Sequence, residues 1–117
     1  MEVNNLEILN KTLKSIEINK SNDSILFTVN DETKYLMYHQ QDCCENVYIE
    51  SITGDIQDLI NSPLLMAQEI ISTDYEETCN HYTYTFYNFA TLKGYVTIRW
   101  IGNSNGYYSE TVNFIKQ

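Results

Sequence analysis

The chain has 117 residues, of which 43% are hydrophobic, and it carries a formal net charge of −9. This length and composition predict one folded domain over residues 1–117 and exclude an intrinsically disordered chain. The acidic balance disfavours direct binding to nucleic acid or to an anionic membrane, because both depend on Lys and Arg side chains. It permits docking on a basic protein surface, and it also serves solubility alone.

The cellular compartment is predicted from the start of the chain and from the cysteines. The first residues, Met1 to Asn5, contain no basic segment and no apolar run follows them, so we expect no signal peptide. No stretch approaches the ~18 apolar residues of a membrane span. The three cysteines are an odd number and favour free thiols in a reducing compartment. We therefore expect a cytoplasmic protein.

The first half of the chain predicts strands separated by short polar turns. Residues 4–10 read as one helical turn or as a lead-in. Alternating apolar and polar residues then predict four strands, over Lys14–Asn19, Ile25–Val29, Thr33–Gln40 and Val47–Ile52. Because the connections are short, we expect neighbouring strands to pair antiparallel.

The second half adds one short helix and four more strands. Asp55 is the predicted N-cap of the helix, and Ser62-Pro63 ends it. The strands are predicted over Leu64–Thr73, Tyr82–Phe89, Tyr95–Ile101 and Tyr107–Ile115. A five-residue hairpin loop, Gly102–Gly106, would join the last two, so that the final three strands form a meander.

These elements predict a mainly β fold. We expect a single antiparallel domain of about eight strands, either a sandwich or a strongly coiled sheet, with one or two short helices. Tyr82–Phe89 is long and apolar, and at a sheet edge it would invite pairing of two copies into a homodimer.

Two long motifs resemble a known family. They are the segment QDCCENVYIE from Gln41 to Glu50 and the block from Thr85 to Ser109, which contains VTIRWIGNSNGYYS. Together with Gly54-Asp55, Leu59-Ile60 and Ser62-Pro63, these motifs are similar to a small family of unknown function carried by phages and by bacteria with prophage-like segments. The resemblance covers roughly Tyr35 to Phe114 and leaves out the first 30 residues and the Asp74–His81 connection. It implies a phage-type origin and no particular activity.

The adjacent cysteines Cys43 and Cys44 admit several interpretations. They could form a redox-sensing pair or supply a nucleophile, whereas a vicinal disulfide is too strained to be an expected structural bond. A zinc site would draw its ligands from both histidines and two of the cysteines, namely His39, Cys43, Cys79 and His81. The carboxylates of Asp42 and Glu45 oppose thiolate formation, and Cys44 could equally be a small core residue. The preferred expectation is no metal and no cofactor.

The Gly102–Gly106 loop is the most suggestive surface. Its backbone amides could bind an anion, Arg99 could pair with a phosphate or carboxylate, and the neighbouring aromatic residues could stack on a ring. The loop matches no phosphate-binding fingerprint. The alternative is a plain hairpin turn whose flanking aromatic residues belong to the core. Strand alternation also places Glu110 on the apolar face, where it would pair with a buried group or be turned outward by a bulge.

Three functions remain open at this point. The preferred hypothesis is a non-enzymatic acidic protein that docks on a host or phage protein with a basic surface and inhibits a nucleic-acid-handling defence complex. The second is a small-molecule or nucleotide-binding protein that uses Arg99 and the loop through Tyr108. The third is a zinc or thiol protein. The predicted binding residues are Asp42, Cys43, Cys44, Glu45, Arg99, Trp100, Asn103, Ser104, Asn105, Gly106, Tyr107 and Tyr108.

Overall fold

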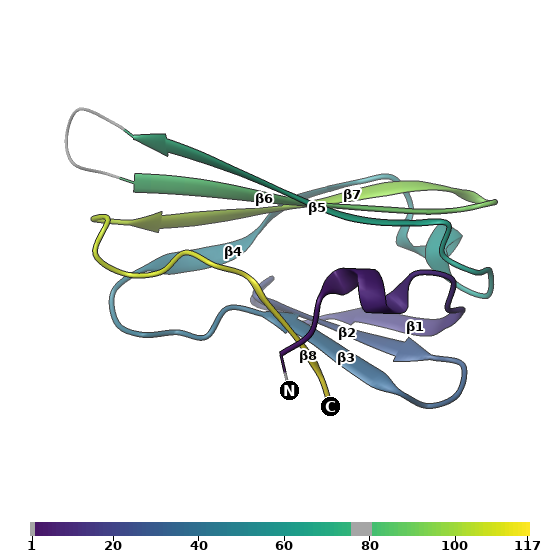
Figure 1. Cartoon of the computed structure of the whole chain (residues 1–117). Helices are drawn as coiled ribbons and strands as arrows, with labels where there is room; N and C mark the ends of the chain where they lie inside the picture. The colour runs from purple at the N-terminus through teal and green to yellow at the C-terminus, as the bar shows by residue number, and fades with distance from the viewer. Residues whose placement is uncertain (1, 76–80) are drawn as a thin grey trace.

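The computed structural model describes residues 2–75 and 81–117, which form mostly β-strands in two antiparallel sheets (Figure 1). The first sheet has the order β1-β2-β3-β8 and the second the order β4-β7-β6-β5. In chain order the elements are η1 (Asn5–Ile8), β1 (Leu13–Ile18), β2 (Ser24–Val29), β3 (Lys34–Tyr38), β4 (Asn46–Thr53), η2 (Ile56–Leu59), β5 (Met66–Tyr75), β6 (His81–Thr91), β7 (Gly94–Ser104) and β8 (Asn113–Lys116). The predicted antiparallel fold of about eight strands is confirmed, with the two 3-10 turns η1 and η2 in place of helices.

The core lies between the two sheets and is rich in aromatic side chains. Alternation along each strand directs one set of apolar residues inward, as expected for strands with one buried face. Phe27 of the first sheet meets Phe89 of the second with ring centroids 5.8 Å apart, and Phe27 also contacts Phe114 at 5.8 Å. Trp100 of β7 is fully enclosed in this core, with 1% of its surface exposed. The aromatic content therefore serves mainly to join the sheets.

The second sheet extends beyond the first at one end of the molecule. Strands β6 and β7 each have 11 residues and β5 has 10, whereas the strands of the first sheet have four to six. In Figure 1 the loop after β3 and the yellow segment before β8 run beneath this overhanging end. The inner face of the overhang is thus covered by loops rather than by a facing sheet.

The predicted final strand, Tyr107–Ile115, is wrong in its extent and in its pairing. Strand β7 continues to Ser104, and the next strand, β8, begins only at Asn113 and pairs with β3 in the other sheet. Residues 102–106 are therefore not a five-residue hairpin loop, and the last three strands do not form a meander. The physical reason is Glu110, which is 5% exposed and packs onto the inner face of β7 instead of continuing a strand beside it.

The other predicted pairings hold only within each sheet. Strands β1, β2 and β3 pair in order, and so do β5, β6 and β7, all antiparallel. The chain changes sheet between β3 and β4 and between β7 and β8, and it reaches the opposite edge of the second sheet between β4 and β5. The segment Tyr82–Phe89 belongs to β6, which is an interior strand and not an edge.

The predicted short helix after Gly54 is a 3-10 turn with the expected cap. The Asp55 side chain accepts a hydrogen bond from the Gln57 backbone N–H at 2.9 Å, so the N-cap prediction is confirmed. Within the described residues, no helix is long and apolar enough to cross a membrane.

Gly102 allows the chain after β7 to approach the inner face of the second sheet. A Cβ at this position would lie 2.6 Å from the Glu110 Cβ and 3.1 Å from the Glu110 carbonyl oxygen. We expect Gly102→Ala to lower the free energy of unfolding by about 1–3 kcal/mol, because the backbone of residue 110 must move to make room. Urea denaturation measures this loss.

Gly94→Ala is the matched control, since a Cβ there would meet the Asp58 carboxylate oxygen at 2.5 Å and that side chain can rotate. We expect the smaller loss for this variant. Equal losses in the two variants would contradict the close approach at Gly102.

Candidate functional site

Two loops at the overhanging end of the molecule form the candidate site. We call residues 39–45 the cysteine loop and residues 105–112 the tyrosine loop. The His39 Nδ1 lies 2.7 Å from the Thr111 carbonyl oxygen, and the Gln40 N–H donates to the Asn113 Oδ1 at 3.0 Å. Two segments about 70 residues apart in the chain are thereby held side by side.

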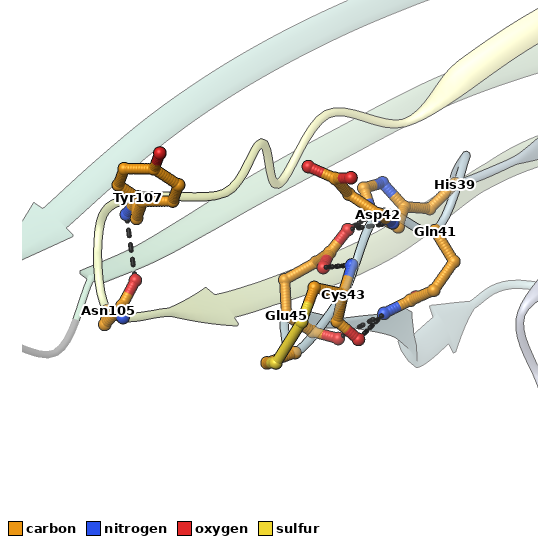
Figure 2. Close-up of a disulfide and its surroundings, with 8 residues drawn as sticks. His39, Gln41, Asp42, Cys43, Glu45, Asn105 and Tyr107 are labelled. Atoms are coloured by element: carbon orange, nitrogen blue, oxygen red, sulfur yellow. Dashed lines mark hydrogen bonds and ion pairs between the residues drawn. A yellow bond between two sulfur atoms is a disulfide. The ribbon is translucent and has the colours of Figure 1, made fainter.

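The cysteine loop is folded around the carboxylate of Glu45 (Figure 2). This carboxylate accepts hydrogen bonds from the backbone N–H groups of Asp42 at 2.8 Å and Cys43 at 2.9 Å. The Gln41 side chain closes the loop from the other side by donating to the Glu45 carbonyl oxygen at 2.7 Å. Glu45 was predicted as a surface binding residue, but its side chain is fully buried and supports the loop from within.

His39 connects the two loops through both of its ring nitrogens. Its Nε2 lies 2.7 Å from the Glu45 Oε2, and its Nδ1 faces the Thr111 carbonyl oxygen. Both oxygens are hydrogen-bond acceptors, so the imidazole ring lies between one acceptor from each loop. The His39 side chain is 4% exposed, so these contacts lie inside the protein and fix the loops relative to each other.

The environment of Glu45 favours its charged form. Burial alone would raise the pKa of this carboxyl group. The N–H of Cys43, the imidazole of His39 and the N–H of Asp42 outweigh burial and lower the pKa from its ordinary value of 4.5 to about 2. Glu45 is therefore ionised at neutral pH and holds the loop as an anion.

A pH dependence of stability follows from the lowered pKa of Glu45. Its contribution is fully present above the ordinary pKa of 4.5 and is lost as the pH falls through about 2. We expect the difference in urea midpoint between the wild type and Glu45→Gln to narrow across this acidic window. A difference that stays constant from neutral pH down to the lowest accessible pH would contradict the role of Glu45.

A second buried carboxylate, Glu110, anchors the tyrosine loop. The His81 Nδ1 lies 2.8 Å from the Glu110 Oε1, and the Ser104 hydroxyl donates to the Glu110 Oε2. The Ser104 Oγ in turn accepts from the Gly106 N–H at 3.0 Å. The Glu110 side chain is 2% exposed. Of the two outcomes considered for Glu110, pairing with buried groups is the one found.

The order of these groups does not suit nucleophilic catalysis. The Glu110 carboxylate lies between the Ser104 hydroxyl and the His81 imidazole. Activation of a serine requires the imidazole in the middle, so that it can accept the hydroxyl proton. The arrangement is suited to fixing the loop and the end of β7.

Cys43 and Cys44 are bonded to each other as a disulfide, and both residues are exposed. The expectation of free thiols is wrong for this pair, and so is the interpretation of Cys44 as a core residue. The tight course of the loop around Glu45 leaves both side chains on the outside of the loop. The bond occupies the sulfur that the zinc hypothesis needed from Cys43.

The four zinc candidates are not assembled in the described part of the chain. His39 and His81 contact different carboxylates, Glu45 and Glu110. Cys79 lies outside the described residues. Among residues 2–75 and 81–117, no group of three or more His, Cys, Asp or Glu side chains could hold a metal ion.

Most of the predicted binding residues meet at one surface. A shallow pocket of about 340 Å³ is lined by Cys44, Asn46, Asn103, Ser104, Asn105 and Tyr108. Asp42 and Gly106 are exposed in the neighbouring loops, and Tyr107 projects from the tyrosine loop with 83% of its surface exposed. The Asn105 side chain accepts from the Tyr107 N–H at 2.9 Å and so holds this turn (Figure 2).

Arg99 and Trp100 do not belong to this surface. Arg99 lies on the outer face of the second sheet, where its guanidinium group stacks on Tyr84 at 4.6 Å and pairs with Glu50 at 3.3 Å. Trp100 is in the core. Both residues lie in β7, whose register directs them to opposite faces of the sheet and away from its end.

Sequence reasoning missed the supporting role of His39, His81 and Glu45, and it missed Asn46 as a pocket residue. The two histidines were considered only as metal ligands or as a catalytic base. A usable signal was present for the tyrosine loop, since strand alternation places Glu110 on the apolar face. The pairing itself depends on which strands lie side by side.

The geometry defines a two-sheet β protein with a loop-covered end that is fixed by buried carboxylate–histidine pairs. By its sequence, the chain belongs to the family described as a domain of unknown function (DUF7448), whose model matches residues 6–114. The match begins well before Tyr35, so it includes the first strands that the motif resemblance left out. No curated protein and no solved structure matches the chain.

Proposed function

We propose that this chain is a non-enzymatic binding protein that docks through its overhanging end on a protein with a basic surface. The docking surface consists of the exposed parts of the cysteine and tyrosine loops, with Asp42 and Tyr107, together with the pocket between Cys44 and Tyr108. The partner is a protein of the host cell. The resemblance of the motifs to phage-borne proteins supports a counter-defence role against a nucleic-acid-handling complex.

The observation that carries this proposal is the contrast between the inside and the outside of the two loops. Inside, Glu45 and Glu110 are buried and paired, so the loops are held in one conformation before any partner binds. Outside, the loops present Asp42 and Tyr107 to solvent. A rigid surface with a projecting aromatic residue loses little conformational freedom on binding, which favours affinity.

Charge supports a basic partner. The chain carries a net charge of −9, and its surface would therefore attract a cationic partner over a distance set by the ionic strength. On the outer face, Asp74 of β5 pairs across the sheet with Tyr82, and Tyr82 pairs with Asn103 at the pocket. The sheet thus adds one exposed carboxylate, Asp74, two strands away from the pocket residue Asn103.

The alternative of a nucleotide-binding protein has less support. The nucleotide-binding hypothesis needed Arg99 to pair with a phosphate. In the structure, Arg99 contacts Glu50 and Tyr84 on the outer face of the sheet. The pocket by the tyrosine loop offers asparagine amides and a tyrosine but no lysine or arginine among its lining residues. A phosphate group would therefore lack a counter-charge there.

Substitution of the projecting aromatic residue tests the proposal. We expect Tyr107→Ala to weaken binding to the partner by roughly thirtyfold or more, as for a central aromatic anchor in an interface. We expect Asp42→Lys to weaken binding most at low ionic strength, because charge attraction is screened by salt. The partner is first retained from a bacterial lysate on the immobilised wild-type chain, and affinities are then measured by calorimetry with the purified partner.

Tyr95→Ala is the matched control, since Tyr95 is an exposed tyrosine of the same strand as the pocket residue Asn103 but lies at the other end of the sheet. It should bind the partner like the wild type. If the purified partner binds the Tyr107→Ala and Asp42→Lys variants as tightly as it binds the wild type, that result would contradict docking at the overhanging end.

A further inference from the structure

The edges of the two sheets differ in how they are protected against pairing with another chain. An exposed edge strand offers unpaired N–H and C=O groups, which natural proteins shield with bulges, charges or covering segments. The edge strand β1 has a register shift between Leu13 and Ser15, and β4 has one between Ile49 and Ser51. The edge strand β8 is only four residues long, and Glu2 bridges to it at Ile115.

In the described part of the chain, strand β5 has no bulge and is not short; its shielding consists of two carboxylates, Glu69 and Asp74, and of η1, which lies near it. It pairs with β6 over ten consecutive residues without a register shift, from Met66 to Tyr75. Its sequence, MAQEIISTDY, contains no lysine, proline or glycine. Alternate residues of an antiparallel strand direct their N–H and C=O groups away from the paired neighbour, so β5 presents a long regular row of such groups.

The side chains at the centre of β5 are apolar and exposed on both faces. Ile70 is 45% exposed and Ile71 is 57% exposed. Successive residues of a strand point to opposite faces, so one isoleucine lies on each side of the sheet edge. On the outer face Ile70 lies beside Phe86 of β6, which gives an apolar row that ends at the open edge.

We propose that two copies of this chain pair antiparallel through β5 and join their second sheets into one sheet of eight strands. Such a contact is two-fold symmetric, so each residue pair occurs twice in the interface. With the axis at Ile70, the isoleucine faces its own copy, Glu69 faces Ile71 of the partner subunit, and Met66 faces Asp74 of the partner subunit. With the axis at Ile71, Glu69 faces Thr73 of the partner subunit.

The charges of β5 are compatible with these central registers and disfavour some others. Glu69 and Asp74 are the two carboxylates of the strand. An axis at Glu69 or at Asp74 would place two like charges directly opposite each other, which is destabilising. An axis at either isoleucine gives every carboxylate an uncharged neighbour and buries the exposed apolar side chains together. The strand is therefore complementary to itself, which favours a second copy over a foreign strand.

Sedimentation velocity of the purified wild-type chain tests this proposal over a wide concentration range. We expect a mass of two chains for the wild type and of one chain for Ile71→Lys, because a lysine at the centre of an edge strand opposes pairing. Ile70→Lys, on the opposite face, should have the same effect. Both positions are exposed, and circular dichroism checks that each variant keeps its strand content.

Leu92→Lys is the matched control, because Leu92 is strongly exposed at the turn between β6 and β7 and lies away from the edge. It should keep the mass of two chains. A wild-type chain that stays monomeric at every concentration would overturn the proposal, and so would a dimer that survives both lysine substitutions. Either result would leave the docking proposal for the overhanging end unaffected, because that proposal is tested separately by measuring the affinity of the Tyr107→Ala variant for the partner.

Discussion

Replacement of Trp100 by alanine is expected to lower the free energy of unfolding by about 3–5 kcal/mol, because it removes the largest fully buried side chain of the core. Trp100 lies on the inner face of β7, opposite Thr85 of β6 and Ile49 of β4. The cavity left by the indole would be lined by strands of a paired sheet, which cannot close around it easily. Urea denaturation followed by circular dichroism measures the loss.

Trp100→Phe separates a core role from a binding role. Among the described residues, the indole Nε1 is buried without a hydrogen-bond partner, so phenylalanine removes no polar contact. We expect this variant to lose much less stability than Trp100→Ala and to bind the docking partner as the wild type does. Loss of partner binding in a folded Trp100→Phe protein would contradict the placement of Trp100 away from the docking surface.

Glu110→Ala is expected to lower the free energy of unfolding by about 3 kcal/mol, because it removes a buried carboxylate that accepts hydrogen bonds inside the protein. His81 would lose its carboxylate and Ser104 its acceptor at the same step. The tyrosine loop would then lose the contact that holds it against β7. The urea midpoint gives the stability, and proton exchange of the backbone amides of residues 105–112 gives the order of the loop.

Glu110→Gln provides the comparison for this effect. Glutamine keeps the size of the side chain and one acceptor oxygen for Ser104, but it removes the carboxylate charge and one of the two oxygens that contact His81. We expect an intermediate loss of stability and an exchange rate of the tyrosine loop between those of the wild type and Glu110→Ala. Variants that leave both stability and exchange unchanged would show that Glu110 does not anchor the loop.

The strands were predictable because one face of each strand is buried. Alternation along Ile25–Val29 and along Tyr95–Ile101 reflects the inward and outward faces of β2 and β7. This local signal does not depend on which strands are neighbours. The Asp55 cap was predictable for the same reason, since its hydrogen bond reaches only two residues along the chain.

The arrangement of the strands was not predictable from local patterns. Residues 107–112 alternate like a strand, but the burial of Glu110 against Gly102 carries the chain to the other sheet, where β8 pairs with β3. This outcome depends on His81, which lies 29 residues away in the sequence. Alternation predicts that a residue points inward and does not reveal which group it meets there.

Several of the predicted binding residues lie together in the structure, but the way in which the two loops are built was not predicted. Asp42 and the segment from Asn103 to Tyr108 do meet at one end of the molecule, around the pocket. Glu45 and Arg99 were grouped with them because of nearness in sequence. The structure places Glu45 beneath the surface and Arg99 on the outer face of the sheet. Neighbouring side chains in a strand or a tight loop face different ways, so nearness in sequence does not place them on one surface.

The central claim is that the overhanging end, with its cysteine and tyrosine loops, is the docking surface. Hydrogen–deuterium exchange of the chain alone and in complex with its captured partner tests it most directly. We expect protection on binding to be concentrated in residues 39–46 and 103–111, with β1 to β3 unchanged. Protection confined to β1, β2 and β3, or an exchange pattern that does not change at the two loops, would contradict the claim.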